Sequence, residues 1–507
     1  MLFFSDSEGE SMRRKFMAAL AAIVVMSVVP AVAEAAPDTL QWGSCPADAA
    51  PVPGLQCATL DVPLDYRHQD GTKIQVAISR LASKNPGKRR VLMLNPGGPG
   101  GPGLDFVATL QVFGLPQSVL DSYDIIGFDP RGIGHSTPVT CDLTPEQQHT
   151  NVPPYAHDAA DVAKRAEYVK GIAHQCGASA TASQLPYTTT ANTARDMDRI
   201  RAALGVPKLS YYGVSYGTYL GAVYTTLFPQ RGDRIVLDSN LGPGGFDVTA
   251  SRRLAQGFQD RFPDFAKFAA AHNAEYGLGA TPEQVTAKYF ELAERLDKTP
   301  VLGIDGVLFR TGTFGQLYND AFFPILAQAW QQLDRSGPAA FAKAKLDFNN
   351  VFSSQLYVVC GDNEWPESVV VYQRHVAADR IRYPMFGAAG ANIWPCAFWP
   401  SGPVEPPVRI GDRGPSDVLM VQNLRDPATP LVGALELRRA LGDRVRMVVA
   451  DQGGHGAYLF KTNACLNDTV TTYLTEGKRP WHDTFCAAEP SQPQSPAPQK
   501  MLEKLHF

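Results

Sequence analysis

Several classes of protein are excluded by what this chain of 507 residues lacks. It has no long run of lysine and arginine beyond its first residues and a formal net charge of −4, so binding to nucleic acid or to an anionic membrane surface is not expected. None of its eight cysteines belongs to a C-x-x-C pair, so the cysteines do not indicate a metal site. No internal repeat is evident. With 44% apolar residues, the chain can bury a sizeable core, and its length predicts one large domain with an insertion.

A long apolar run at residues 16–29 follows basic residues at 13–15 and precedes small residues. This pattern predicts a signal peptide over residues 1–35, cleaved after Ala33 or Ala35, and therefore a secreted or periplasmic protein. A membrane anchor is the alternative, but the run is shorter than the ~20 residues that a membrane span needs. We therefore expect no stable membrane insertion after cleavage. No cysteine directly follows the cleavage region, so a bacterial lipid anchor is not expected either.

The cysteines are even in number and scattered along the chain, which favours disulfide bonds formed in an oxidising compartment. The sequence alone does not determine their connectivity, and buried free thiols are the alternative. The simplest scheme pairs neighbours along the chain: Cys45 with Cys57 and Cys465 with Cys486 first, then Cys141 with Cys176 and Cys360 with Cys396.

Short apolar runs alternate with helical stretches along most of the chain. The expected strands are a hairpin at 58–66 and 73–81, then runs at 90–95, 123–129, 209–214, 234–238, 418–424 and 444–450. Continuous apolar runs of this length are typical of strands buried on both faces. The alternation predicts an α/β fold with a mostly parallel central sheet flanked by helices. The clearest helix is expected at 193–204, capped by Thr193 at its start and by Gly205 at its end.

The strand series is interrupted between residues 241 and 416, which we interpret as an inserted, mainly helical cap domain. Helices are expected there at 254–272, 282–296 and 314–333, followed by a loop-rich region. The sheet domain then comprises 36–240 and 417–487, and the proline-rich tail at 488–507 is expected to be disordered. Such a cap would lie over the carboxyl ends of the strands, where open α/β sheets bind ligands.

The segment G-V-S-Y-G at residues 213–217 lies between an expected strand and an expected helix. A serine on such a sharp turn, a nucleophile elbow, presents its hydroxyl to a substrate, and the flanking glycines allow the close approach of neighbouring backbone. Ser215 is therefore the candidate nucleophile, with an ordinary glycine-rich turn as the alternative.

A serine nucleophile needs a base and an acid that orients the base, and in the α/β-hydrolase arrangement they follow in the order serine, acid, histidine. His455 lies in a glycine-rich loop after the last expected strand, and Asp426 follows the strand before it. The prolines at 427 and 430 stiffen the loop that carries Asp426. Weaker candidates for these two roles are Asp417, Asp451, His482 and His506.

The oxyanion of an acyl-transfer intermediate requires backbone N–H donors. One is expected from Tyr216, directly after the nucleophile. The other is expected from Gly98, in the glycine-rich loop 95–103 that follows a buried strand. A phosphate-binding loop is the alternative, but neither a G-K-[ST] ending nor G-x-G-x-x-G spacing is present.

Together these motifs resemble the α/β-hydrolase fold enzymes, and within them the secreted prolyl iminopeptidase and tripeptidyl aminopeptidase group. P-G-G-P-G at 96–100 looks like that group's H-G-G-P-G oxyanion loop, and D-P-R-G-I-G-H-S at 129–136 looks like its D-x-R-G-x-G-x-S segment. The sequences around Asp426 and His455 resemble the acid and histidine loops of the C-terminal region typical of the tripeptidyl aminopeptidases. The resemblance spans most of residues 40–487 and implies hydrolysis of peptides from their free N-terminus.

The resemblance also implies a carboxylate for the substrate ammonium. Asp362 and Glu364 look like the acidic segment that follows a cysteine in the tripeptidyl group, and solvated loop carboxylates are the alternative. Pro96 stands where prolyl iminopeptidases carry histidine, which weakens a strict specificity for proline. Arg131 is expected to tie its loop by salt bridge or hydrogen bonds rather than to act in catalysis.

Three functions remain open at this point. The first is a secreted serine exopeptidase, of tripeptidyl or prolyl aminopeptidase type, that works through an acyl-enzyme on peptide substrates and needs no metal or organic cofactor. The second is a carboxylesterase or lipase-like enzyme of the same fold. The third, a catalytically inactive binding protein, is disfavoured by the complete set of triad candidates. The sequence carries no indication of an oligomeric state.

Overall fold

A computed structural model of the chain describes residues 40–85, 87, 89–148, 152–336 and 347–489. The predicted signal peptide at 1–35 and most of the predicted tail at 488–507 lie outside these residues. Within the described ranges, no helix is long and apolar enough to cross a membrane.

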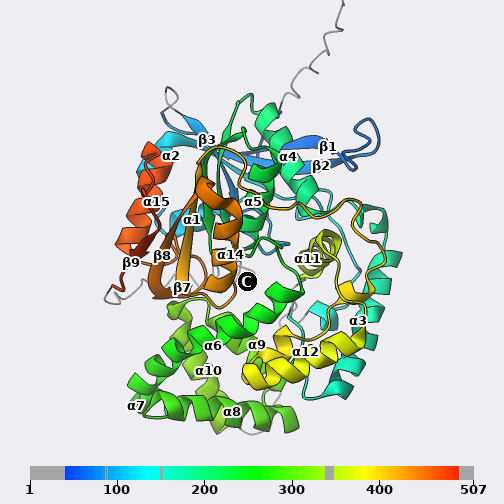
Figure 1. Cartoon of the computed structure of the whole chain (residues 1–507), viewed down its shortest axis with the longest axis vertical. Helices are drawn as coiled ribbons and strands as arrows, with labels where there is room; N and C mark the ends of the chain where they lie inside the picture. Colours follow the sequence, from blue (N-terminus) through cyan, green and yellow to red (C-terminus); the bar gives the residue numbers. More distant parts are fainter. Residues whose placement is uncertain (1–39, 86, 88, 149–151, 337–346, 490–507) are drawn as a thin grey trace, which may run out of the picture. The chain divides into compact units, whose positions relative to one another are not determined.

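The described strands form one sheet in the order β1-β2-β4-β3-β5-β6-β7-β8-β9 (Figure 1). β2 pairs antiparallel with both β1 and β4, and all other neighbours are parallel. The bounds are β1 (Leu55–Pro63), β2 (Lys73–Leu81), β3 (Arg90–Asn95), β4 (Tyr123–Phe128), β5 (Leu209–Val214), β6 (Gly232–Asp238), β7 (Val418–Arg425), β8 (Val445–Gly453) and β9 (Thr484–Cys486).

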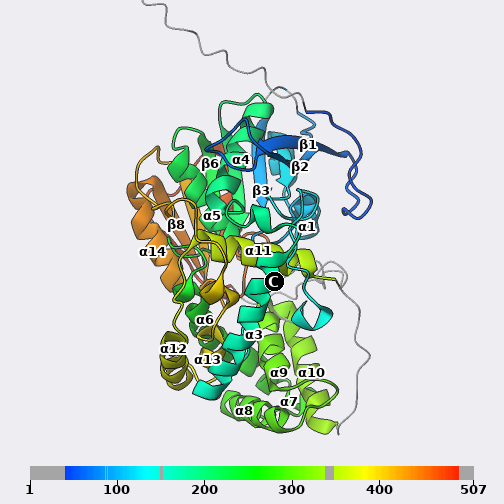
Figure 2. The same cartoon turned by 90° about the vertical axis from the view of Figure 1, so that its right-hand side faces the viewer.

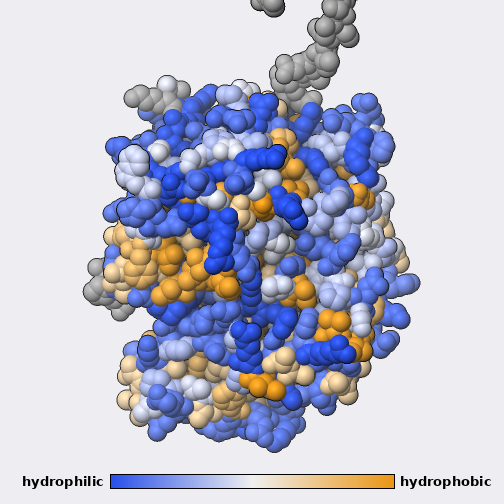
Figure 3. Space-filling view, in the orientation of Figure 1, coloured by the Kyte–Doolittle hydropathy of each residue, from blue (hydrophilic) through white to orange (hydrophobic). Residues whose placement is uncertain are grey.

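The mostly parallel sheet confirms the predicted fold class, and β3 and β5 agree with the expected strands residue for residue. β9 was not predicted, because its three residues are too few to show a pattern. β9 lies at the edge of the sheet and leaves Phe485 exposed, and Leu435 of the nearby helix α14 (Leu431–Leu441) is also exposed. Figure 3 shows a hydrophobic area in this region of an otherwise mostly hydrophilic face.

Helices cover both faces of the sheet, because successive strand residues alternate between two apolar clusters. Met93, Tyr211 and Leu237 pack on the face with α4, α5 and α14, whereas Leu94 and Tyr212 pack on the face with α1, α2 and α15. The bounds of these helices are α1 (Phe106–Val112), α2 (Gln117–Ser122), α4 (Thr190–Ala203), α5 (Tyr216–Leu227) and α15 (Ala464–Glu476), and α3 (Ala159–Ala178) precedes α4.

Between β6 and β7 the chain forms a helical insertion with an aromatic core of its own, in which Phe258, Phe262 and Trp330 are buried. The insertion and the sheet belong to one compact unit, Asp38–Phe507. The helices are α6 (Val248–Ala271), α7 (Asn273–Tyr276), α8 (Pro282–Lys298), α9 (Gly306–Gln316), α10 (Phe323–Arg335), α11 (Asn349–Asp362), α12 (Val369–Arg382) and α13 (Gly387–Gly390).

Three expectations about helices were wrong. The helix expected at 314–333 is two helices, α9 and α10, separated by a 3-10 turn at Asp320–Phe322. The helix expected at 193–204 begins at Thr190 and is capped by Thr189, whose side chain accepts from the backbone of the first turn. The region expected to be loop-rich contains α11 and α12, and Figure 2 shows α11 between the strands and other helices of the insertion. Residues 353–361 of α11 are all buried, so no amphipathic period marks this helix.

All four disulfide bonds join the cysteines that the neighbour scheme pairs, and no free cysteine remains among the described residues. The predicted pairing is therefore confirmed. The bonds are distributed widely: Cys45–Cys57 ties the N-terminal segment to β1, and Cys465–Cys486 ties α15 to β9. Cys141–Cys176 and Cys360–Cys396 fix the segments around α3 and α11.

Candidate active site

Ser215 lies between the end of β5 and the start of α5, with φ of 59° and ψ of −123°. A positive φ is unfavourable for a residue with a side chain, so the surrounding structure must hold this turn in place. The backbone N–H of Ser215 donates to the carbonyl of Asp238 at 2.9 Å, and the Ser215 carbonyl accepts from the N–H of Thr218 at 2.9 Å. The backbone therefore has the geometry of the predicted nucleophile elbow.

Asp426 and His455 form a buried pair next to this elbow. His455 Nδ1 lies 3.0 Å from both carboxylate oxygens of Asp426, and the two residues are 4% and 1% exposed. Asp426 Oδ1 also accepts from the backbone N–H groups of Ala428 and Thr429, each at 2.9 Å. The carboxylate is therefore fixed by its own loop and can hold the imidazole with Nε2 directed away from it.

The insertion also holds the histidine. The backbone N–H of His455 donates to the carbonyl of Tyr318 at 2.8 Å, and the Tyr318 ring lies edge-on to the imidazole with 5.0 Å between ring centroids. Tyr318 lies between α9 and α10, more than a hundred residues from His455 in sequence. This contact was not predicted, because no local sequence pattern relates the two residues.

Asp238, the last residue of β6, fixes the loop that follows the histidine. Its carboxylate accepts from the backbone N–H groups of Ala457 and Tyr458, both at 2.8 Å, and from the hydroxyl of Tyr212 at 2.9 Å. Complete burial raises the pKa of Asp238 to about 6. This role of Asp238 was not predicted, although a carboxylate at the end of a predicted strand could have indicated it.

A group of charged side chains joins the insertion to the loops that carry the acid and the histidine. Lys461, six residues after His455, pairs with Asp320 at 3.0 Å, and burial lowers the pKa of this lysine to about 8. Arg425, next to the acid, bonds Asp264 of α6 at 2.8 Å and Asp451 at 2.6 Å. Asp320 and Asp264 both pair with Arg261 of α6, so the contacts form one connected network.

The weaker sequence candidates lie elsewhere. Asp451 is paired with Arg425, and Asp417, at the opposite end of β7 from the acid loop, lies 3.6 Å from Arg444. His482 is exposed, and His506 lies outside the described residues. None of the three described residues lines the cavity that contains Ser215 and His455.

The glycine-rich loop passes directly over the elbow. A Cβ added to Gly97 would lie 2.4 Å from the carbonyl oxygen of Val214 and 3.2 Å from the backbone nitrogen of Tyr216, so only glycine fits there. The next residue, Gly98, has φ of +109° and lines the cavity with Ser215. The Tyr216 N–H belongs to the first turn of α5, whose N–H groups have no acceptor within the helix. Both residues that are expected to supply oxyanion donors therefore lie beside the candidate nucleophile.

The segment 129–136 supports this loop. Asp129 Oδ1 accepts from the backbone of Gly103 at 2.8 Å and of Leu104 at 3.1 Å, which fixes the end of the glycine-rich loop. Arg131 is buried and forms a salt bridge with Asp196 at 2.6 Å, in addition to hydrogen bonds to three backbone carbonyls. The predicted structural role of Arg131 is confirmed.

A cavity of about 460 Å³ lies in front of Ser215 and His455. Its walls come mainly from the insertion and are largely apolar, and no Asp, Glu, Lys or Arg is found among the described residues that line it. Its apolar lining comprises Val152, Leu241, Phe246, Leu254, Ile304, Leu308, Phe314, Phe348, Val351, Phe352 and Trp394. Within the described ranges, no cluster of three or more His, Cys, Asp or Glu could hold a metal ion.

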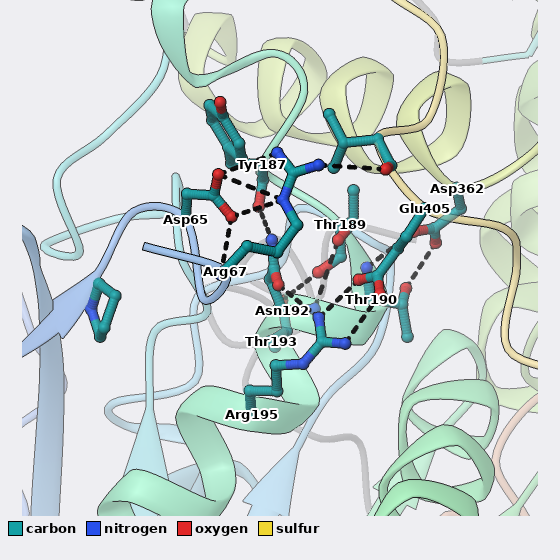
Figure 4. A network of polar contacts seen from close by, with 12 residues as sticks. Asp65, Arg67, Tyr187, Thr189, Thr190, Asn192, Thr193, Arg195, Asp362 and Glu405 are labelled. Carbon is teal, nitrogen blue, oxygen red and sulfur yellow. Dashed lines mark hydrogen bonds and ion pairs between the residues drawn. The ribbon is translucent and has the colours of Figure 1, made fainter. Parts of the chain in front are cut away.

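The structure does not bring Asp362 and Glu364 into this cavity. Glu364 is exposed, and Asp362, the last residue of α11, lines a separate small cavity with Tyr219 and Glu405. Asp362 accepts from the backbone N–H of Thr190 at 2.7 Å and from its hydroxyl at 2.5 Å (Figure 4). Burial raises the pKa of Asp362 to about 7.

Comparison with known proteins shows the family to which this chain belongs. Residues 383–486 match the family model of TAP-like proteins. Tripeptidyl aminopeptidase of Streptomyces lividans is 36% identical over 90% of this chain and 88% of that protein. Serine protease Hip1 of Mycobacterium tuberculosis is 30% identical over 88% of this chain and 91% of that protein, and carboxylesterase B of the same species is 31% identical over 88% and 89%. The chain therefore belongs to the family of the tripeptidyl aminopeptidase-like serine hydrolases, within the α/β-hydrolase fold.

Proposed function

We propose that this protein is a secreted serine aminopeptidase that releases short peptides from the free N-terminus of its substrates. The observation that carries the proposal is the bond between Asp426 and His455, because His455 lines the same cavity as Ser215 and Gly98. The names of the tripeptidyl aminopeptidase and Hip1 relatives support peptides as substrates. The four disulfide bonds support an oxidising destination outside the cytoplasm.

In the proposed mechanism, His455 Nε2 takes the proton of the Ser215 hydroxyl while Oγ attacks the scissile carbonyl carbon. Asp426 accepts the Nδ1–H bond, which sets the tautomer and stabilises the imidazolium. The backbone N–H groups of Gly98 and Tyr216 stabilise the oxyanion. His455 then gives its proton to the leaving amine, and water, activated by the same imidazole, hydrolyses the acyl-enzyme.

The cavity supports an exopeptidase, because residues of the insertion form most of its walls in front of Ser215. A volume of about 460 Å³ suits a ligand of a few residues rather than a continuous polypeptide segment. The apolar walls favour uncharged side chains in the residues next to the cleaved bond.

An aminopeptidase also needs acceptors for the substrate ammonium, and we assign one of them to Gln316. This residue lines the cavity at the C-terminal end of α9, where helix dipoles favour positive charge. Its Oε1 atom is buried and has no hydrogen-bond partner among the described residues. Asp362 and Glu364 are less suited to this role, since neither lines the cavity. We expect Gln316→Leu to raise KM for free-amine peptides and to leave KM for N-acetylated analogues unchanged.

An esterase of the same fold is the second candidate. It is favoured by the uncharged, apolar lining of the cavity and by the 31% identity to carboxylesterase B. In such an enzyme the cavity would accept an acyl chain, and a free amine on the substrate would have no effect on the rate.

A matched fluorogenic panel tests the proposal: a free-amine tripeptide, a free-amine proline substrate, the N-acetylated form of each, and a short-chain ester. Wild type and Ser215→Ala are compared on each substrate. The proposal predicts cleavage of the free-amine peptides by the wild type alone. Cleavage restricted to esters, or indifference to acetylation, would favour the esterase, and residual peptide cleavage by Ser215→Ala would reject Ser215 as the nucleophile.

A further inference from the structure

Helix α11 contacts the glycine-rich loop that carries one proposed oxyanion donor. A Cβ added to Gly100 would lie 2.5 Å from the carbonyl oxygen of Val351 and 3.2 Å from Ser354 Oγ, so the loop rests directly on the backbone of the helix. Gly100 is two residues from Gly98. The position of α11 therefore limits where this loop can lie.

The other end of the same helix reaches the second donor. Asp362 ends α11, and its carboxylate accepts both the N–H and the hydroxyl of Thr190, the first residue of α4. The Thr190 hydroxyl is also hydrogen-bonded to the phenolic hydroxyl of Tyr216 (Figure 4 shows the Asp362 and Thr190 side chains). A chain of two hydroxyls thus links Asp362 to the residue after the nucleophile.

Above its raised pKa of about 7 the Asp362 carboxylate is ionised, and its charge then fixes the direction of this chain. An ionised carboxylate only accepts hydrogen bonds, and Thr190 has a single hydroxyl proton to give it. Tyr216 must then donate to the Thr190 oxygen, which leaves one arrangement of the protons. Thr190 and Tyr216 are 1% and 4% exposed, so water has little access to the bond between their hydroxyls, whereas Asp362 is partly exposed. Hydrogen bonds to an ionised group are the stronger kind.

Helix α11 is itself firmly held. The disulfide Cys360–Cys396 lies two residues before Asp362. At the other end, Asn349 Oδ1 accepts from the backbone of Leu143 at 2.9 Å, and Asn350 Oδ1 accepts from that of Gly134 at 2.9 Å. The helix can therefore act as a rigid support between the two oxyanion donors.

We propose that Asp362 is a positioning residue of the oxyanion hole, which fixes Tyr216 through Thr190, and that α11 keeps the Gly98 and Tyr216 donors at the right separation. In this proposal Asp362 does not bind the substrate amine, which was its expected role. The inference rests on the proposed function in one respect, the use of the Tyr216 N–H as an oxyanion donor. It applies equally to peptide and ester substrates, because both pass through a tetrahedral oxyanion.

The test uses the full-length enzyme with the variants Asp362→Asn, Thr190→Val, Thr190→Ser and Tyr216→Phe. Thr190→Val and Tyr216→Phe each remove one hydroxyl of the chain, and Asp362→Asn replaces the anionic acceptor by a neutral amide, while all three leave the backbone donor in place. We expect kcat to fall by about tenfold to hundredfold, less than the ~10²–10³-fold cost of removing an oxyanion donor outright, with KM nearly unchanged. Thr190→Ser keeps the hydroxyl and should keep kcat. Glu405→Gln is the matched control, because this carboxylate lines the same small cavity but pairs with Arg195.

The double variant Asp362→Asn/Tyr216→Phe should be no slower than the slower single variant, since both substitutions break one chain. Multiplied losses of the two single variants would overturn the proposal. A raised KM for free-amine peptides alone in Asp362→Asn would instead assign Asp362 to the amine, and wild-type kcat in Tyr216→Phe would reject the hydroxyl chain. If Asp362→Asn fails to fold, Thr190→Val and Tyr216→Phe test the same hydroxyl chain at its two buried members. The kcat of each variant is also measured on the ester. A loss of kcat on the ester would support the role of Asp362 even if the wild type cleaves no peptide, a result that would reject only the aminopeptidase assignment.

Discussion

Replacing Gly257 by alanine sets two well-understood effects against each other. Gly257 lies inside α6, where alanine is ordinarily more favourable than glycine by ~1 kcal/mol. Here, however, the helix backbone packs on the acid loop. An alanine Cβ would lie 2.1 Å from the carbonyl oxygen of Pro427 and 2.9 Å from that of Asp426. Both neighbours are backbone atoms, so no rotamer change can relieve the overlap.

The overlap should decide the outcome. An ordinary separation requires α6 or the acid loop to move by about 1 Å, and overpacking of this kind costs ~1–3 kcal/mol, which exceeds the gain in helix propensity. The displaced segment carries Asp426, whose carboxylate lies 3.0 Å from His455 Nδ1. A misplacement of ~1 Å in a catalytic group can reduce the rate by ~10²-fold. We therefore expect Gly257→Ala to lower kcat/KM by about a hundredfold. The same substitution should also lower the unfolding free energy.

Gly171→Ala is the matched control. Gly171 also lies inside a long helix, α3, but it is exposed and a Cβ there would meet nothing within 4 Å. This variant should gain ~1 kcal/mol of stability and keep full activity. Urea unfolding and kcat/KM on the best substrate of the panel measure both effects. If Gly257→Ala is as active as the wild type and as stabilised as Gly171→Ala, the packing argument is refuted.

Three further predictions follow from single contacts. Asp426→Asn should reduce kcat by ~10⁴-fold with little change in thermal stability, because the amide favours the wrong histidine tautomer; a loss below tenfold would contradict the assignment. Burial raises the pKa of Asp238 to about 6, above its unfolded value of ~4. Between pH 4 and pH 6 the folded state therefore binds more protons than the unfolded state. The unfolding free energy consequently falls as the pH rises, by ~3 kcal/mol in total. The stability of the wild type relative to Asp238→Asn should therefore decrease from pH 4 to pH 7, and a pH-independent difference would disprove this account. Replacing Cys465 and Cys486 by serine opens a loop of 21 residues and should cost ~2–4 kcal/mol in urea unfolding, while an unchanged midpoint would show that the bond is not stabilising.

The sheet, the elbow and the order of the candidate triad could be predicted from the residues alone. Strands buried on both faces appear as short apolar runs, so β3 and β5 were predicted to the residue. Because the carboxyl ends of parallel strands meet at one edge of a sheet, residues that follow such strands, such as Ser215, Asp426 and His455, could be expected close together. The disulfide pairs could also be predicted, because each bond joins two cysteines that are neighbours along the chain.

How the insertion contacts the site depends on long-range packing, which no local pattern encodes. Helix α11 gave no periodic signal because it is buried all round, and the contact of Tyr318 with His455 joins residues that no local pattern relates. Asp362 shows the limit most clearly. The resemblance of its segment to that of the tripeptidyl aminopeptidases implied an amine ligand, but the packing of α11 on α4 directs the carboxylate to Thr190 instead. A short motif specifies which chemical group is available, whereas the long-range packing of the helix that carries it determines what that group can reach.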